Sequence, residues 1–284
     1  MRIINTYPEI VTLYGELGGK FDMEAWEAYA AWISPSLVAM CKEDLADYDF
    51  DKEVLPTLTN ALNKRADLDK THESFAAVTA GLPERFREIF GVDMDVDIVL
   101  YFGLCNGAGW ATPLDGRFAV LLGVEQIIKL GWHSEKSMIG LIYHELGHIL
   151  HLFHGHRRAL HMANERLTGG DKWLWQLYYE GIAMYCEQLL VGDFARYHQD
   201  VDGWADNCRA NLNDGLQEFK SRLCNDESAQ DFFGDWSKWR GRADFGYFLG
   251  CEFVKRLVVR YSLEELLDMP YAAVKRAFDA LQSL

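Results

Sequence analysis

Residues 137–148 read SMIGLIYHELGH, a stretch that contains two histidines four positions apart and a glutamate directly after the first of them. The apolar residues that precede His144 predict a helix, and residues four apart on a helix lie on the same face. Two imidazoles at this spacing can bind one metal ion, so His144 and His148 are candidate ligands. Glu145 would then stand beside the ion as a candidate general base.

The predicted helix, which we place at residues 137–154, is apolar on nearly all sides. Its large apolar residues are Leu141, Ile142, Leu146, Ile149, Leu150, Leu152 and Phe153. Such a helix is expected to be buried, and polar side chains inside it are costly unless they have partners. A bound zinc ion would be a partner for the two histidines and the glutamate together. The alternative, a helix whose polar residues face solvent, does not explain the apolar surroundings.

A catalytic zinc site has three protein ligands and leaves one position for water. The chain offers three candidates for the third ligand, which are Glu180, His154 and Asp171. We favour Glu180, because it lies in a second helical stretch among bulky apolar residues and is therefore expected to point inward. The small residues Gly181 and Ala183 would let this second helix pack closely on the first.

The other two candidates are less well placed. His154 stands where one class of zinc enzymes has its third histidine, but His151 occupies the position at which those enzymes turn with a glycine. We interpret residues 151–158 as the polar, cationic end of the helix, with Gly155 as its stop. Asp171 follows two glycines and is typical of a turn or a helix cap.

The spacing of these segments resembles a known family. Residues 144–148 followed by Glu-Gly-Ile-Ala at residues 180–183 resemble the gluzincin branch of zinc metallopeptidases. More narrowly, the chain is similar to the predicted zinc-dependent protease families that carry HExxH and then an EG[LI]A segment. A GYxxG sequence at residues 246–250 extends the resemblance, which covers roughly residues 95–270. It implies a thermolysin-like zincin fold.

The resemblance also implies roles for single residues. It assigns zinc (Zn²⁺) to His144, His148 and Glu180, general-base catalysis to Glu145, and stabilisation of the oxyanion to Tyr247. Three other donors for the oxyanion stay open: His198, Arg240 and Arg242. Many gluzincins carry an acidic residue shortly after the third ligand that orients another ligand, but Met184 stands there in this chain.

The pattern along the chain predicts an α+β protein that is mostly helical. We expect a helical N-terminal region at residues 1–92 and a zincin-like catalytic region at 93–284. Within the latter we expect a small antiparallel sheet at 94–125, packed beside the metal helix at 137–154, and a helical C-terminal part at 172–284. The expected N-terminal helices are residues 23–33, 35–46, 54–67 and 72–80 and one that Pro83 opens.

Two strands are expected in the sheet, at residues 96–102 and 117–123, with a turn at 106–109. Residues 117–123 are either an edge strand that pairs with an extended substrate or an ordinary core strand. Gly107 and Gly109 either let a substrate backbone approach or make a hairpin turn.

Composition limits the partners and the compartment. The chain is 49% apolar and 25% charged, with a net charge of −15 and no basic runs, which argues against nucleic acid and anionic membranes as partners. Six scattered cysteines without C-x-x-C pairs indicate buried free thiols, and the N-terminus lacks a secretion signal. We therefore expect a cytoplasmic protein.

The sequence thus predicts a zinc hydrolase whose substrate is a peptide or protein. Two other hypotheses stay open. One is a zincin-fold protein that binds zinc in a binding or regulatory role without catalysis. The other is a helical scaffold without metal, in which carboxylates satisfy the two histidines.

Overall fold

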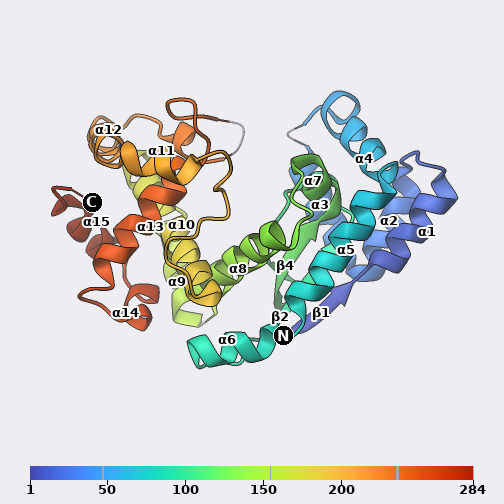
Figure 1. The fold of residues 1–284 in the computed structure, drawn as a ribbon, viewed down its shortest axis with the longest axis horizontal. Coiled ribbons are helices and arrows are strands. Elements are labelled where there is room, and N and C mark those ends of the chain that lie inside the picture. The colour runs from blue at the N-terminus through green and yellow to red at the C-terminus, as the bar shows by residue number, and fades with distance from the viewer. Residues whose placement is uncertain (47, 154, 235–236, 284) are drawn as a thin grey trace. The chain divides into compact units, whose positions relative to one another are not determined.

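The structure of the protein is a computed structural model that describes residues 1–46, 48–153, 155–234 and 237–283 (Figure 1). Contacts group the chain into two compact units, Met1–Glu145 and Leu146–Leu284. The division falls inside one continuous helix, α8 (Glu135–Leu152). The boundary expected between residues 92 and 93 stays a prediction.

The first unit contains a four-stranded sheet with the order β1-β2-β4-β3. The strands are β1 (Arg2–Asn5), β2 (Val96–Tyr101), β3 (Trp110–Leu114) and β4 (Arg117–Gly123). β1, β2 and β4 are parallel, and only β3 is antiparallel to its neighbour. The sheet is therefore mixed, and the expectation of an antiparallel sheet was wrong because the chain returns to β2 and β4 through crossover connections.

Two strands, β1 and β3, were not expected from the sequence, and they change the role of β4. β4 lies between β2 and β3, so it is a core strand and not the edge strand. The edge is β3, which joins β4 through a two-residue turn. Asp115 and Gly116 hold positive φ values of 49° and 81° in that turn, as a type I′ hairpin requires.

Helices surround the sheet in this unit. They are α1 (Tyr7–Leu17), α2 (Met23–Ile33), α3 (Pro35–Leu45), α4 (Leu55–Leu62), α5 (Arg65–Thr79), α6 (Leu82–Phe90) and α7 (Val124–Leu130), with a π-helical turn at Phe50–Val54. The helices expected at 23–33 and 35–46 and the one opened by Pro83 are confirmed. The helix expected at 54–67 ends at Leu62, where Asn63 turns its side-chain amide onto the carbonyl of Thr59, and α5 runs on from Arg65 to Thr79.

The second unit is helical. It contains α9 (Gly155–Asn164), α10 (Gly169–Val191), α11 (Trp204–Ala210), α12 (Leu212–Cys224), α13 (Phe245–Leu257), α14 (Leu263–Leu267) and α15 (Tyr271–Asp279), with a 3₁₀ turn at Gln230–Phe232. α10 and α13 pack against each other (Figure 1), and one glycine from each helix lies at their contact. A Cβ at Gly181 would lie 2.4 Å from the carbonyl oxygen of Gly250, so the two backbones touch there.

The α+β class with a majority of helix is confirmed, whereas the thermolysin-like core stays a prediction. All six cysteines are free thiols, as expected, but only four are buried, because Cys105 is half-buried and Cys224 is exposed. In the part of the chain that the structure describes, no helix combines the length and the apolar character needed to cross a membrane.

Candidate metal centre

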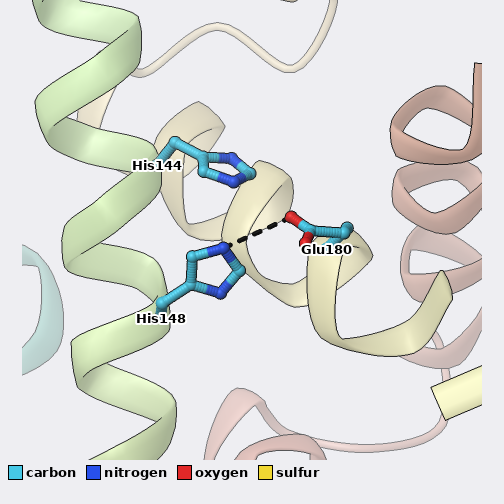
Figure 2. A group of neighbouring side chains, drawn as sticks. All are labelled: His144, His148 and Glu180. Atoms are coloured by element: carbon cyan, nitrogen blue, oxygen red, sulfur yellow. Dashed lines mark ion pairs between the residues drawn. The ribbon is translucent and has the colours of Figure 1, made fainter. Parts of the chain in front are cut away.

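The two histidines lie on one face of α8 and are both buried. His144 is 5% exposed and His148 is 6% exposed. α8 begins at Glu135 and ends at Leu152, close to the predicted bounds. Figure 2 shows the two rings one helical turn apart, both directed toward Glu180 of α10. The spacing in the sequence therefore produces the shared face that it predicted.

Glu180 completes a group of three side chains. It is 5% exposed, and its Oε2 lies 3.3 Å from Nε2 of His148. One ligand atom from each of His144, His148 and Glu180 lies within 4.8 Å of the other two (Figure 2). The group can hold a metal ion, and the choice of Glu180 over the other candidates agrees with this geometry.

The distance between His148 and Glu180 provides a test of fit. Two ligand atoms that each lie about 2.0–2.1 Å from one tetrahedral ion are about 3.4 Å apart. The 3.3 Å between Nε2 of His148 and Oε2 of Glu180 matches this separation. Two imidazoles and one carboxylate, all buried, are also the donor types that a transition-metal ion takes in proteins.

Close packing of α10 against α8 positions the ligands. A Cβ at Gly147 would lie 2.8 Å from Cα of Ala183, so this glycine lets the two helices approach. The expected role of Ala183 in this contact is confirmed. Gly181 instead faces α13, where it meets Gly250.

Neighbouring side chains hold the ligands in orientation. Gln176 lies one helical turn before Glu180 and donates from Nε2 to its Oε1 at 2.7 Å, which leaves Oε2 directed at His148. The ring of Tyr179 stacks on that of His148, with 4.1 Å between centroids and 17° between planes. Neither Gln176 nor Tyr179 was singled out from the sequence.

A second carboxylate lies near His144. Glu187 is fully buried on α10, and its Oε2 accepts a hydrogen bond from Nδ1 of His198 at 2.6 Å. One ligand atom from each of His144, Glu187 and His198 lies within 4.8 Å of the other two. Glu187 lies on the same helix seven residues after Glu180, and it was not singled out from the sequence.

Glu145 projects from α8 beside a glycine of the first unit. Its side chain is half-buried, and a Cβ at Gly109 would lie 2.9 Å from its Oε1 and 2.7 Å from Cδ1 of Leu141. The backbone of Gly109 therefore passes against the Glu145 carboxylate, and a side chain at this position would make Glu145 and Leu141 shift. It also immediately precedes the edge strand β3.

Among the remaining candidates from the sequence, the structure gives contacts for Asp171 and Tyr247. Asp171 accepts a hydrogen bond from the hydroxyl of Tyr271 at 2.6 Å, which ties it to α15 and not to the metal group. His154 lies outside the described residues. Tyr247 is half-buried on α13, one turn before Gly250, with its ring centroid 6.2 Å from that of Phe233. Its role as an oxyanion donor stays a prediction, as do those of the alternatives Arg240 and Arg242.

The interpretation of residues 151–158 as a cationic helix end is corrected. His151 is 2% exposed among aromatic rings that include those of Trp175 and Tyr178, and burial lowers its pKa to about 3, so it is neutral. Arg157 is also buried and pairs with Glu264 and Asp268. The side chains of His156 and Arg158 lie outside the described residues. The apolar pattern of α8 continues past His148, which explains why its last turn is buried.

Comparison of the chain with protein-family models, with curated proteins and with solved structures gave no match.

Proposed function

We propose that this protein is a zinc-dependent peptidase in which His144, His148 and Glu180 hold the ion and Glu145 is the general base. The observation that carries the proposal is the buried group of two histidines and a glutamate, with Glu145 next to the first ligand in the chain. Zinc accepts nitrogen and oxygen ligands in this number when one position stays open for chemistry. A purely structural zinc site would fill all four positions with protein ligands.

The bound ion would lower the pKa of a water molecule and polarise the carbonyl of the scissile bond. The residues of the chain supply the remaining steps. Glu145 takes the proton from the attacking water and then delivers it to the leaving nitrogen. Gln176 keeps one oxygen of Glu180 occupied, so that the other faces His148. Tyr247 is our candidate for a hydrogen-bond donor to the oxyanion.

The open edge of the sheet supports a peptide as the substrate. The amide of Gly123 donates to the carbonyl of Ala108 at 3.1 Å, and hydrogen-bonded pairs alternate along an antiparallel ladder. Ala111 and Pro113 therefore direct their main-chain groups away from β4. Proline has no amide hydrogen and is tolerated at such an edge. An extended peptide could add to β3 through the amide and carbonyl of Ala111.

The proposal predicts that Glu145→Gln keeps the metal and loses the chemistry. Glutamine has the shape of glutamate but cannot accept the proton, so hydrolysis should fall by about 10²- to 10⁴-fold, the usual contribution of a general base. Metal content should stay at one zinc per chain. The measurement is elemental analysis together with digestion of a diverse peptide pool, read by mass spectrometry with and without a chelator.

The matched control for this experiment is Glu135→Gln, the same change at an exposed position in the first turn of α8. It should cleave the pool at the wild-type rate. Retained hydrolysis in Glu145→Gln would exclude Glu145 as the base. Wild-type protein that binds zinc and cleaves no peptide would instead support a binding or regulatory role without catalysis. A chain that binds no zinc would leave the metal-free scaffold as the remaining hypothesis.

A further inference from the structure

One glutamate of the first unit, Glu125, is completely buried away from the candidate metal ligands. Glu125 lies in the first turn of α7 and has no exposed surface. Its two carboxylate oxygens each accept a backbone hydrogen bond, from the amide of Gly103 at 2.8 Å and from that of Cys105 at 3.0 Å. Both donors belong to the segment 103–109 that connects β2 to β3, so one side chain holds the start of this segment.

Two glycines make room for this carboxylate. A Cβ at Gly103 would lie 2.7 Å from Oε1 of Glu125, and a Cβ at Gly123 would lie 3.1 Å from the same atom. The carboxylate thus occupies space that side chains at either position would fill. The arrangement requires Gly103 to match Gly123 and Glu125, which lie about twenty residues later in the chain, and this indicates a specific fit.

Three further contacts fix the rest of the segment. Gln126 donates from Nε2 to the carbonyl of Cys105 at 3.1 Å, Asn106 donates to the carbonyl of Cys41 at 3.0 Å, and Gly123 donates to the carbonyl of Ala108. Cys105 itself has a φ of 69°, a left-handed conformation that residues with a Cβ disfavour. The segment therefore depends on these contacts to keep its shape.

The far end of the same segment confines Glu145. A Cβ at Gly109 would lie 2.9 Å from Oε1 of Glu145, so a side chain there would displace the Glu145 carboxylate, and β3 begins at the next residue. Movement of segment 103–109 would move both the wall beside Glu145 and the start of the edge strand. Glu125 is the residue whose hydrogen bonds hold the other end of this segment.

We propose that Glu125 is a positioning residue that fixes segment 103–109, and through Gly109 fixes the space around the Glu145 carboxylate. The consequence for turnover rests on the proposed function of Glu145. The anchoring of the segment does not, so it can be tested without any substrate.

Glu125→Gln tests the anchoring. Glutamine keeps the volume but has a single acceptor oxygen and places an amide group against a backbone donor. Cys105 reports on the segment because it is half-buried there, and both burial and the nearby charge of Glu125 raise the pKa of its thiol. In the variant, alkylation of Cys105 by iodoacetamide, measured by peptide mapping relative to the exposed Cys224, should be faster by about tenfold, as expected when hydrogen bonds that hold a local structure are lost.

Two further variants separate anchoring from general loss of stability. Asp97→Asn alters another buried carboxylate, one that pairs with Arg2 and Arg117 at the opposite end of β2, and it should leave the alkylation rate of Cys105 unchanged. Gln126→Ala removes one contact to Cys105 from a half-buried position and leaves the charge of Glu125 in place. Faster alkylation in this variant therefore reports the anchoring itself and not a change in the electrostatics of the thiol, even if Glu125→Gln does not fold.

The catalytic consequence is measured on the best-cleaved peptide of the pool. Glu125→Gln should lower kcat by roughly 10- to 100-fold, the scale of a misplaced catalytic group, with little change in KM or zinc content. Wild-type alkylation of Cys105 in both Glu125→Gln and Gln126→Ala would overturn the anchoring. Faster alkylation with unchanged kcat would overturn the link to Glu145. Absence of hydrolysis by the wild-type protein would refute the proposed function and leave the thiol result standing.

Discussion

Gln176 is the side chain on which the orientation of Glu180 depends most directly. Its amide donates to Oε1 of Glu180, and the other oxygen then faces His148. Residues that orient metal ligands in this way change affinity by about 10- to 100-fold when they are removed. Gln176→Ala should therefore weaken zinc binding by roughly tenfold, because Glu180 loses its preferred rotamer while the ligand itself remains.

Competition with a chromophoric chelator measures this affinity. Gln217→Ala, the same change at an exposed position of α12, is the control and should bind zinc as the wild type does. An unchanged dissociation constant in Gln176→Ala would show that the packing of α10 alone orients Glu180.

The sequence could predict the metal ligands because their signal is local. His144 and His148 are four residues apart on one helix, and Glu180 stands in an apolar helical stretch where an unpaired carboxylate would be costly. Gln176 lies one helical turn before Glu180, so the same reasoning from helix periodicity could have identified it. The roles of Glu125 and His198 could not be predicted in this way, because they depend on partners 11 to 22 residues away in the chain that only the fold brings near.

At the level of elements, the crossing of α10 and α13 determines where Glu180 lies. A Cβ at Gly250 would fall 2.3 Å from the carbonyl of Leu177, and backbone atoms cannot yield as a flexible side chain can. Gly250→Ala should therefore separate the helices and lower stability by about 1–3 kcal/mol, the usual cost of overpacking. Because Gly181 lies at the same contact, the adjacent Glu180 should shift and zinc affinity should also fall.

Gly15→Ala is the matched control for this prediction. Gly15 lies inside α1, and its added Cβ would meet nothing within 4 Å. Alanine should stabilise this helix by about 0.5–1 kcal/mol relative to glycine. Urea unfolding of both variants gives the comparison. Equal stabilities for Gly250→Ala and the wild type would mean that the crossing has room that its backbone geometry does not suggest.

Helices were easier to predict than strands, for a physical reason. α2, α3 and α6 carry their own boundaries, such as Pro35 at a first turn and Gly91 at a left-handed C-cap. β1 has only four residues and gains its hydrogen bonds from β2, more than ninety residues later. β3 contains Pro113, which weakens any strand signal, and its pairing depends on the Asp115–Gly116 turn. The mixed order of the sheet follows from such distant pairings.

At the scale of the whole molecule, the sequence pattern predicts the fold class, and the composition and net charge predict the class of partner, but neither predicts which contacts stabilise the fold. The prediction of a mostly helical α+β protein needed only the spacing of apolar residues. The exclusion of nucleic acid and membranes as partners, the cytoplasmic location and the peptide substrate stay predictions. No family model matches the chain, so these three predictions have to be tested by experiment. The structure does specify one further property, the pH dependence of stability.

Glu125 gives that pH dependence a definite sign. Burial raises its pKa from 4.5 to about 7, so the fold favours the protonated form. A carboxyl with a raised pKa contributes most below its unfolded pKa, and this contribution declines as pH rises toward the folded pKa. Between about pH 5.5 and pH 7.5 the free energy of unfolding should therefore fall by about 2 kcal/mol on account of this group.

Comparison of the wild type with Glu125→Gln isolates this contribution. Neutral His151 acts in the opposite direction, since its lowered pKa makes stability fall with decreasing pH, but it is present in both proteins and cancels in the difference. Urea unfolding across this pH range should show that the wild type loses stability relative to the variant as pH rises. A difference that does not change with pH would mean that Glu125 titrates near its ordinary value, and that the two backbone hydrogen bonds at Gly103 and Cys105 offset the cost of burying its charge.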